Sequence, residues 1–202
     1  MIAAAPQTSV HKLRFHEPIR NLPGRRDART GESDFTLAFA RAYVAQFSAL
    51  HRRSCHRHIA CAREIPVNGF GIADLVAVLW PDRLPVAGHR WPSLRAFTEE
   101  TGPLVRAFEL KLGSWRAAML QAHRYRYYAH SAVVVLPLAV AETASAYLAT
   151  FRTIHVGLWG FDPDAQRIVV YHTPPPRQPL APAYIAVAIK KVAKASKALP
   201  VP

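Results

Sequence analysis

Three charged residues in two apolar segments are the first candidates for chemistry in this sequence. Asp74 interrupts the apolar segment 72–80, and a carboxylate is costly to bury there without a partner. Glu109 and Lys111 lie two positions apart in the apolar segment 105–112, so in a strand both side chains point to the same face. If these two strands are neighbours, the carboxylates converge and the lysine stands beside them.

Two close carboxylates require a cation, and ligation by oxygen alone favours Mg²⁺ or Mn²⁺. A metal ion in this position activates water and stabilises charge on a phosphate. Lys111 would orient or deprotonate the attacking water and neutralise the phosphate. The alternative is an exposed Glu109–Lys111 pair together with an ion pair between Asp74 and an arginine. A lone Glu-x-Lys motif favours that alternative, but the carboxylate within the preceding apolar strand favours the metal site.

The distribution of basic residues also singles out Lys111. The chain contains twenty Arg and only six Lys, and Lys111 is the single lysine between residues 13 and 189. Lysine, unlike arginine, is readily tuned as a compact proton donor or acceptor. A chain that uses arginine almost everywhere therefore has a chemical reason for a lysine at this position.

The net charge indicates an anionic partner. The 202 residues include 26 Lys and Arg against 13 Asp and Glu, a formal net charge of +13. Nucleic acid is the first candidate partner and an anionic membrane surface the second, while a basic protein without such a partner is the remaining alternative. No apolar stretch reaches the length of a membrane span, no secretory signal pattern occurs, and two cysteines form no disulfide framework. These features predict a cytoplasmic protein.

Hydrophobic periodicity predicts one α/β domain. We expect a flexible basic arm at 1–32, the α/β domain at 33–176 with an insertion at 81–103 between the catalytic strands, and a basic C-terminal tail at 177–202. The expected helices are 34–52, 93–100, 114–130, 140–150 and 183–198, and the expected strands are 59–67, 72–80, 105–112, 132–136, 155–161 and 167–172. The first three strands predict a meander, which a later strand joins through a helical crossover.

Two motifs carry a resemblance to a known family. Gly71-Ile72-Ala73-Asp74-Leu75-Val76 and Phe108-Glu109-Leu110-Lys111, followed by a helix and an apolar strand, resemble the PD-(D/E)XK nuclease superfamily over roughly residues 34–137. The resemblance implies a restriction-endonuclease-like core, with a central mixed sheet flanked by helices. It also implies that Asp74 and Glu109 bind the metal and that Lys111 assists the attacking water. Ala73 stands where the family has the proline of its name.

A third motif lies on the helix after the second catalytic strand. Gln121-Ala122-His123-Arg124-Tyr125 resembles the Q-h-x-x-Y motif of RecB-type exonucleases. Gln121 and Tyr125 share one helix face, so both are expected to reach the nucleic-acid backbone or to support the site. The alternative is an ordinary packed tyrosine with a solvated glutamine.

Further metal ligands are expected around these residues. The Leu110 carbonyl is one candidate. Glu64 is another, because related nucleases often carry an acidic residue upstream of the catalytic Asp, sometimes from the first helix; an ion pair with an arginine is the alternative role for Glu64. Glu32 and Asp34 are weaker candidates, and Asp34 is better explained as a helix cap.

Basic residues near the site predict contacts with phosphates. The expected nucleic-acid-binding residues are Arg116, Arg124 and Arg126 on the helix after Lys111, and Lys190, Lys191, Lys194 and Lys197 near the C-terminus. Tyr127 and Tyr128 follow the arginines, and aromatic residues interleaved with arginine can stack bases. A solvated helix face with two core tyrosines is the alternative, and the C-terminal lysines also fit a membrane-surface helix.

The sequence therefore predicts a nuclease that uses Mg²⁺ or Mn²⁺ to hydrolyse phosphodiester bonds, with DNA as the first candidate substrate and RNA as the second. Two alternatives remain open: a nucleic-acid-binding module on the same fold that no longer cuts, and a basic protein that acts by contacting another protein. Endonuclease or exonuclease action, and assembly into a homodimer or a larger complex, also remain open.

Overall fold

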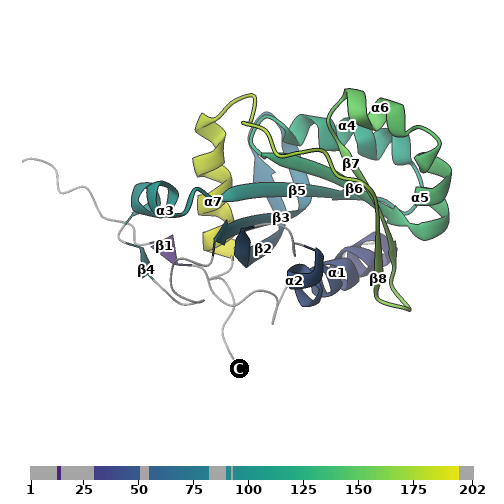
Figure 1. Cartoon of the computed structure of the whole chain (residues 1–202), viewed down its shortest axis with the longest axis horizontal. Coiled ribbons are helices and arrows are strands. Elements are labelled where there is room, and N and C mark those ends of the chain that lie inside the picture. Colours follow the sequence, from purple (N-terminus) through teal and green to yellow (C-terminus); the bar gives the residue numbers. More distant parts are fainter. Residues whose placement is uncertain (1–12, 15–29, 51–54, 82–89, 92, 196–202) are drawn as a thin grey trace, which may run out of the picture.

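The computed structural model of the chain describes residues 13–14, 30–50, 55–81, 90–91 and 93–195 (Figure 1). Most of the expected basic arm and much of the expected insertion at 81–103 lie outside these ranges. The described elements form an α/β fold in which helices flank a six-stranded mixed sheet. No helix in the described ranges is long and apolar enough to cross a membrane.

The strand order combines an antiparallel hairpin region with a parallel centre. Across the sheet lie β2 (His56–Val67), β3 (Gly71–Pro81), β5 (Leu104–Leu110), β6 (Ser131–Pro137), β7 (Gly157–Asp162) and β8 (Arg167–His172). β2, β3 and β5 form an antiparallel meander, β5, β6 and β7 are parallel, and β8 pairs antiparallel with β7. Helix α4 (Trp115–Tyr125) carries the chain from β5 to β6. The expected meander and helical crossover are thus confirmed.

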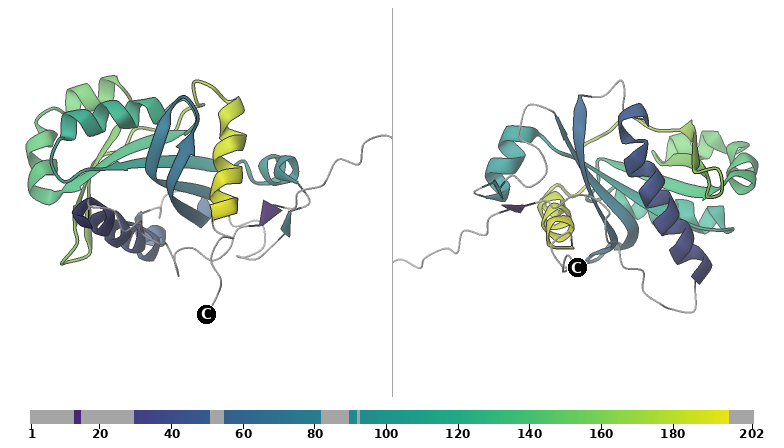
Figure 2. Two further views of the ribbon diagram at one scale, coloured as in Figure 1. Left: turned by 180° about the vertical axis from the view of Figure 1, so that it is seen from behind. Right: turned by 90° about the horizontal axis from the view of Figure 1, so that it is seen from below.

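Helices cover both faces of the sheet and enclose one apolar core on each side. One face carries α3 (Leu94–Thr101), α4, α5 (Leu138–Ser145), α6 (Leu148–Thr153) and α7 (Ala183–Ala195). The other carries α1 (Thr30–Ala45) and α2 (Phe47–Leu50), as the view from below in Figure 2 shows. The central strands β5 and β6 are buried on both faces, which explains why their sequences are almost continuously apolar. A short ladder of β1 (Leu13–Arg14) and β4 (Arg90–Trp91) lies apart from this sheet.

Several expected element bounds are wrong. The helix expected at 34–52 begins at Thr30 and divides into α1 and α2, and the helix expected at 140–150 is the pair α5 and α6. The helix expected to reach residue 130 ends at Tyr125, where Arg126 and Tyr128 turn back with backbone bonds to residues three positions earlier. The strand expected at 105–112 ends at Leu110, although the backbone N–H of Lys111 still donates to Val135 of β6.

Helix α7 packs on the sheet beside the β2–β3 hairpin. Its residues Ala188, Ile189, Val192 and Ala193 are buried in the same core as α4, whereas Lys190 and Lys194 are exposed. The Lys191 Nζ donates to the Pro66 carbonyl of β2. The helix expected in the basic C-terminal tail is therefore one of the elements that hold the hairpin in place.

This packing predicts a large difference between two neighbouring positions of α7. Ile189 is fully buried, so Ile189→Ala is expected to lower the free energy of unfolding by about 2–5 kcal/mol through lost burial and the cavity left behind. Lys190→Ala, on the exposed side, is expected to change it by less than about 0.5 kcal/mol. Urea denaturation followed by circular dichroism measures both values, and equal effects would contradict the packing of α7.

Candidate active site

Partway along β2 and β3, the alternation of side chains between the two cores is interrupted. Cys61 belongs to the core under α1 while Ile65 belongs to the core under α7, and Leu75 and Ala73 of β3 differ in the same way. In a regular strand, residues of equal parity share a face, so an irregular residue must lie between them. Glu64 is such a residue, since its φ of 51° is rare for a residue other than glycine.

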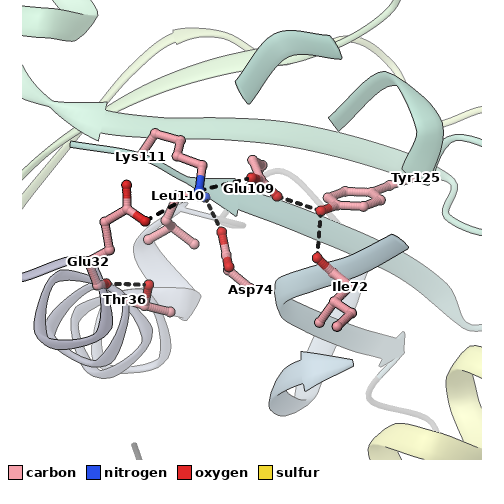
Figure 3. A network of polar contacts seen from close by, with 8 residues as sticks. All are labelled: Glu32, Thr36, Ile72, Asp74, Glu109, Leu110, Lys111 and Tyr125. Atoms are coloured by element: carbon pink, nitrogen blue, oxygen red, sulfur yellow. Dashed lines mark hydrogen bonds and ion pairs between the residues drawn. The ribbon is translucent and has the colours of Figure 1, made fainter. Parts of the chain in front are cut away.

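Asp74 lies at the same level of β3, where this strand stops pairing with β5. The β3–β5 ladder ends at the pair Leu75–Phe108, so β5 continues without a backbone partner on that side. Asp74 fills this gap, because its Oδ2 accepts a hydrogen bond of 2.7 Å from the Leu110 backbone N–H (Figure 3). Burial raises the pKa of Asp74, and the bond from Leu110 and the charge of Lys111 oppose that increase.

Glu109 is the most deeply buried carboxylate of the site, with 1% of its surface exposed. Burial raises its pKa from 4.5 to about 7, and the negative charge of Asp74 contributes to the increase. The Tyr125 hydroxyl donates to Glu109 Oε2 at 2.5 Å, which partly opposes it. The two carboxylates thus lie close together in a buried environment, where the negative charge of one disfavours ionisation of the other. A bound cation would relieve this repulsion.

Tyr125 joins strands β3 and β5. Its hydroxyl lies 2.5 Å from Glu109 Oε2 and 2.8 Å from the Ile72 carbonyl of β3, and burial raises its pKa, so it stays a proton donor. A phenol has one proton to donate. When Glu109 is ionised, its carboxylate accepts the hydrogen bond from the Tyr125 hydroxyl. When Glu109 is protonated, its own O–H can donate to the Tyr125 oxygen, and the tyrosine then donates to the Ile72 carbonyl. The tyrosine holds Glu109 in both states.

Lys111 reaches a carboxylate on each side. Its Nζ lies 3.3 Å from Glu32 Oε2 and 3.7 Å from Glu109 Oε1, and 20% of the lysine side chain is exposed. Glu32 comes from the first turn of α1, where Thr36 Oγ1 donates to its backbone carbonyl at 2.8 Å (Figure 3). The amine therefore lies at the boundary between the buried carboxylates and solvent.

The place of Glu32 beside Lys111 differs from the ranking made from the sequence. Glu64, ranked first among the supplementary acids, is an exposed residue of β2, whereas the lower-ranked Glu32 contacts the lysine. The sequence does carry a signal, because Glu32 precedes Phe35 by three residues and Phe39 by seven and so shares the apolar face of α1. Asp34, expected as a cap, is an exposed residue within α1.

The other residues expected to contact nucleic acid or support the site differ in their exposure and in their partners. Gln121 lies one turn before Tyr125 on the same helix face and is partly exposed, and Arg124 is exposed. The Arg116 guanidinium lies over the Trp115 ring at 4.2 Å and the Tyr147 ring at 5.2 Å. Arg126 donates from Nη1 to the Ile154 carbonyl at 3.0 Å, which ties α4 to the end of α6. Lys197 lies outside the described residues.

The oxygen donors of the site fit a hard divalent cation. Within the described ranges, no three His, Cys, Asp or Glu side chains are gathered closely enough to hold a metal ion by themselves. Mg²⁺ commonly uses one or two carboxylates and completes its shell with water and substrate phosphates. Asp74 and Glu109, which repel one another when ionised, would supply these two carboxylate ligands.

Comparisons of the chain with protein-family models, curated proteins and solved structures gave no match. The functional proposal therefore depends on the fold and on the side-chain geometry.

Glu109→Gln is expected to stabilise the metal-free protein at pH 8, because the amide keeps the shape and the acceptor for Tyr125 but removes the buried charge. The folded-state pKa of Glu109 lies above its ordinary value, so the parent has its full stability below about pH 4.5 and loses stability as pH rises through about 7. The variant should therefore melt roughly 2–6 °C higher at pH 8 and at nearly the same temperature as the parent at pH 4.

Thermal melts in EDTA across this pH range measure the difference. Addition of Mn²⁺ at pH 8 should raise the melting temperature of the parent and leave that of Glu109→Gln nearly unchanged. A variant that is less stable than the parent at pH 8 would show that burial and the charge of Asp74 do not disfavour ionised Glu109.

Proposed function

We propose that this chain is a metal-dependent nuclease of the PD-(D/E)XK kind, built on a restriction-endonuclease-like core. The observation that supports the proposal best is the bond from Leu110 N–H to Asp74 across the gap between β3 and β5. It brings a carboxylate of one strand to the strand end that carries Glu109 and Lys111. The buried carboxylate pair, the adjacent amine and the supporting tyrosine are the groups that metal-assisted hydrolysis requires.

Asp74 and Glu109 are the residues that would hold Mg²⁺ or Mn²⁺, with the Leu110 carbonyl as a further donor. When bound, the cation supplies an activated water and stabilises the charge that develops on the phosphate. The two oxygens of Glu109 have different partners: Oε2 accepts from Tyr125, while Oε1 faces Lys111 at 3.7 Å. Tyr125 therefore fixes the carboxylate so that Oε1 is directed toward the reacting groups.

Lys111 orients or deprotonates the attacking water and neutralises charge on the phosphate. Glu32 acts on this amine from α1, since its Oε2 lies 3.3 Å from Nζ. This contact restrains a flexible side chain in a fixed place, and restraint of the reacting groups is a large part of enzymatic rate enhancement. Glu32 is thus a positioning residue for Lys111 in the proposed mechanism.

The proposed substrate is nucleic acid, DNA rather than RNA. The formal net charge of +13 favours a polyanion, and Arg124, Lys190 and Lys194 present exposed positive charges. The decisive experiment is incubation of linear, circular and single-stranded DNA with the protein, with and without Mg²⁺. Cleavage that requires the metal would support the proposal, and binding without cleavage would favour a binding module on the same fold.

Lys111→Ala is expected to lower the rate of Mg²⁺-dependent cleavage by at least about a hundredfold, the contribution typical of a positioned proton-transfer group, while DNA affinity stays close to that of the parent. Lys111→Arg keeps the charge, but a guanidinium is larger and does not give up its proton, so it should also fail. Substantial activity of Lys111→Arg would indicate that the residue acts through charge alone. Arg41→Ala, which removes an exposed positive charge on α1 at a residue with no role in the proposed site, is the matched control. If Lys111→Ala cuts as fast as the parent, this assignment of the active site is wrong.

Calorimetry with Mn²⁺ separates the metal ligands from the positioning residue. Asp74→Asn and Glu109→Gln each remove one charged ligand and are expected to abolish measurable binding heat. Glu32→Gln is expected to keep the Mn²⁺ affinity within about twofold and to slow cleavage by roughly tenfold, because it loosens Lys111. Loss of Mn²⁺ binding in Glu32→Gln would make Glu32 a third ligand instead.

A further inference from the structure

Three aromatic residues from distant parts of the chain meet beside the candidate active site. This aromatic cluster consists of Phe70 in the turn between β2 and β3, Tyr127 directly after α4 and Tyr184 at the start of α7. The Phe70 and Tyr127 rings are stacked, with centroids 4.8 Å apart and 14° between their planes, and Tyr184 meets Phe70 edge-on at 5.0 Å. Tyr127 is 39% exposed and Tyr184 37%, so much of each ring faces solvent.

The aromatic cluster is joined to the site by short backbone segments. Phe70 precedes Ile72 by two residues, and the Ile72 carbonyl accepts the hydrogen bond from Tyr125. Tyr127 follows Tyr125 by two residues in the turn that ends α4. Figure 2 shows the hairpin tip, the end of α4 and the start of α7 together at one side of the molecule. A ligand on the exposed rings would therefore lie next to the residues that hold Glu109.

Positive charge gathers at the end of α4, where Arg126 directly precedes Tyr127 in the chain. We call Arg126, His155 and Arg177 the basic cluster: Arg126 adjoins Tyr127 and donates to the Ile154 carbonyl, and His155 Nε2 lies 3.1 Å from the Pro175 carbonyl. The segment that follows Arg177 runs along the end of α4, since the backbone N–H groups of residues 177, 180 and 181 donate to the carbonyls of residues 130, 126 and 127.

The charges that act within the basic cluster repel one another. Burial lowers the pKa of Arg126, and the charge of Arg177 lowers it further. Burial also lowers the pKa of His155, and both arginines add to that decrease. The two arginines repel one another and favour the neutral form of His155, and phosphate oxygens bind favourably between like positive charges of this kind.

We propose that the aromatic cluster and the basic cluster together bind a single-stranded segment of nucleic acid. Unpaired bases stack on the exposed rings of Tyr127 and Tyr184, and backbone phosphates contact Arg126 and Arg177. A single strand is the form that fits, because base faces are free to stack on side chains only when the bases are unpaired. The inference rests on the proposed function, as it takes nucleic acid to be the substrate of the adjoining site, and it assigns single-stranded ends or regions as the preferred form.

The test measures binding in EDTA, so that cleavage plays no part. The probes are a fluorescent oligothymidylate and an abasic oligomer with the same number of phosphates. The parent should bind oligothymidylate about tenfold more tightly than the abasic oligomer, and the double variant Tyr127→Ala, Tyr184→Ala should remove this preference without weakening abasic binding. Tyr147→Ala is the matched control, because Tyr147 is 44% exposed but lies against Trp115, in the link between α5 and α6.

A charge variant tests the basic cluster separately. Arg177→Ala is expected to weaken binding of both probes and to reduce the slope of log affinity against log salt by roughly 0.7. Arg41→Ala removes the same charge from an exposed position on α1, which covers the opposite face of the sheet, and should leave both quantities unchanged.

Leucine variants guard against loss of folding. Tyr127→Leu and Tyr184→Leu keep apolar contact with Phe70 but remove the rings, and together they should show the same loss of preference with a melting temperature near that of the parent. Equal weakening for both probes in the tyrosine variants, or the same loss of preference in Tyr147→Ala, would overturn the inference. A protein that prefers oligothymidylate but cuts no DNA with Mg²⁺ would refute the nuclease proposal alone. One that cuts without this preference would refute only the assignment of the single-strand surface.

Discussion

Where β3 diverges from β5, the backbone of β5 would be left with an unpaired N–H group at Leu110, and the Asp74 carboxylate supplies its partner at 2.7 Å. An unsatisfied buried N–H costs roughly 1–3 kcal/mol, so the acidic side chain at this place completes the sheet as well as the site. The same bond fixes the distance between the two strands. Since Glu109 precedes Leu110 and Lys111 follows it, the relative placement of all three charged groups follows from one contact between a side chain and the backbone.

The remainder of the fold keeps the two carboxylates in a buried environment that disfavours their charged forms. Alternate residues of β5 point to opposite cores: Phe108 packs against Phe39 of α1 with ring centroids 5.3 Å apart, whereas Glu109 meets Tyr125 of α4. The apolar layers on both faces remove water from the carboxylates and raise their pKa values. Stability that these layers provide elsewhere is thus partly spent in keeping two acids close, an arrangement common at functional sites and rare in purely structural ones.

Much of this arrangement could be predicted from the sequence because it is local. The Glu109-Leu110-Lys111 spacing, the helical spacing of Gln121 and Tyr125 and the apolar strands depend on short-range periodicity, and the mixed sheet with its meander and crossover is confirmed. The pairing of Glu32 with Lys111 depends instead on how α1 lies across the sheet, which no local pattern specifies. The positive φ of Glu64 could not be predicted either, because Gly or Asn usually marks such a position in a sequence. The nuclease activity and the bound metal remain predictions, because both concern molecules outside the chain.

The contact between α7 and the β2–β3 hairpin has a consequence for how the protein acquires its shape. Lys191 and its acceptor Pro66 are 125 positions apart in the chain. At ordinary rates of translation the ribosome needs roughly 6 to 25 s to produce the intervening segment. During that interval the strand that carries Asp74 has no helix α7 over its inner face, and pairs so distant in sequence form slowly. The inner face of the nascent hairpin therefore stays uncovered for that interval, and the hairpin gains its final packing only after most of the described chain has left the ribosome.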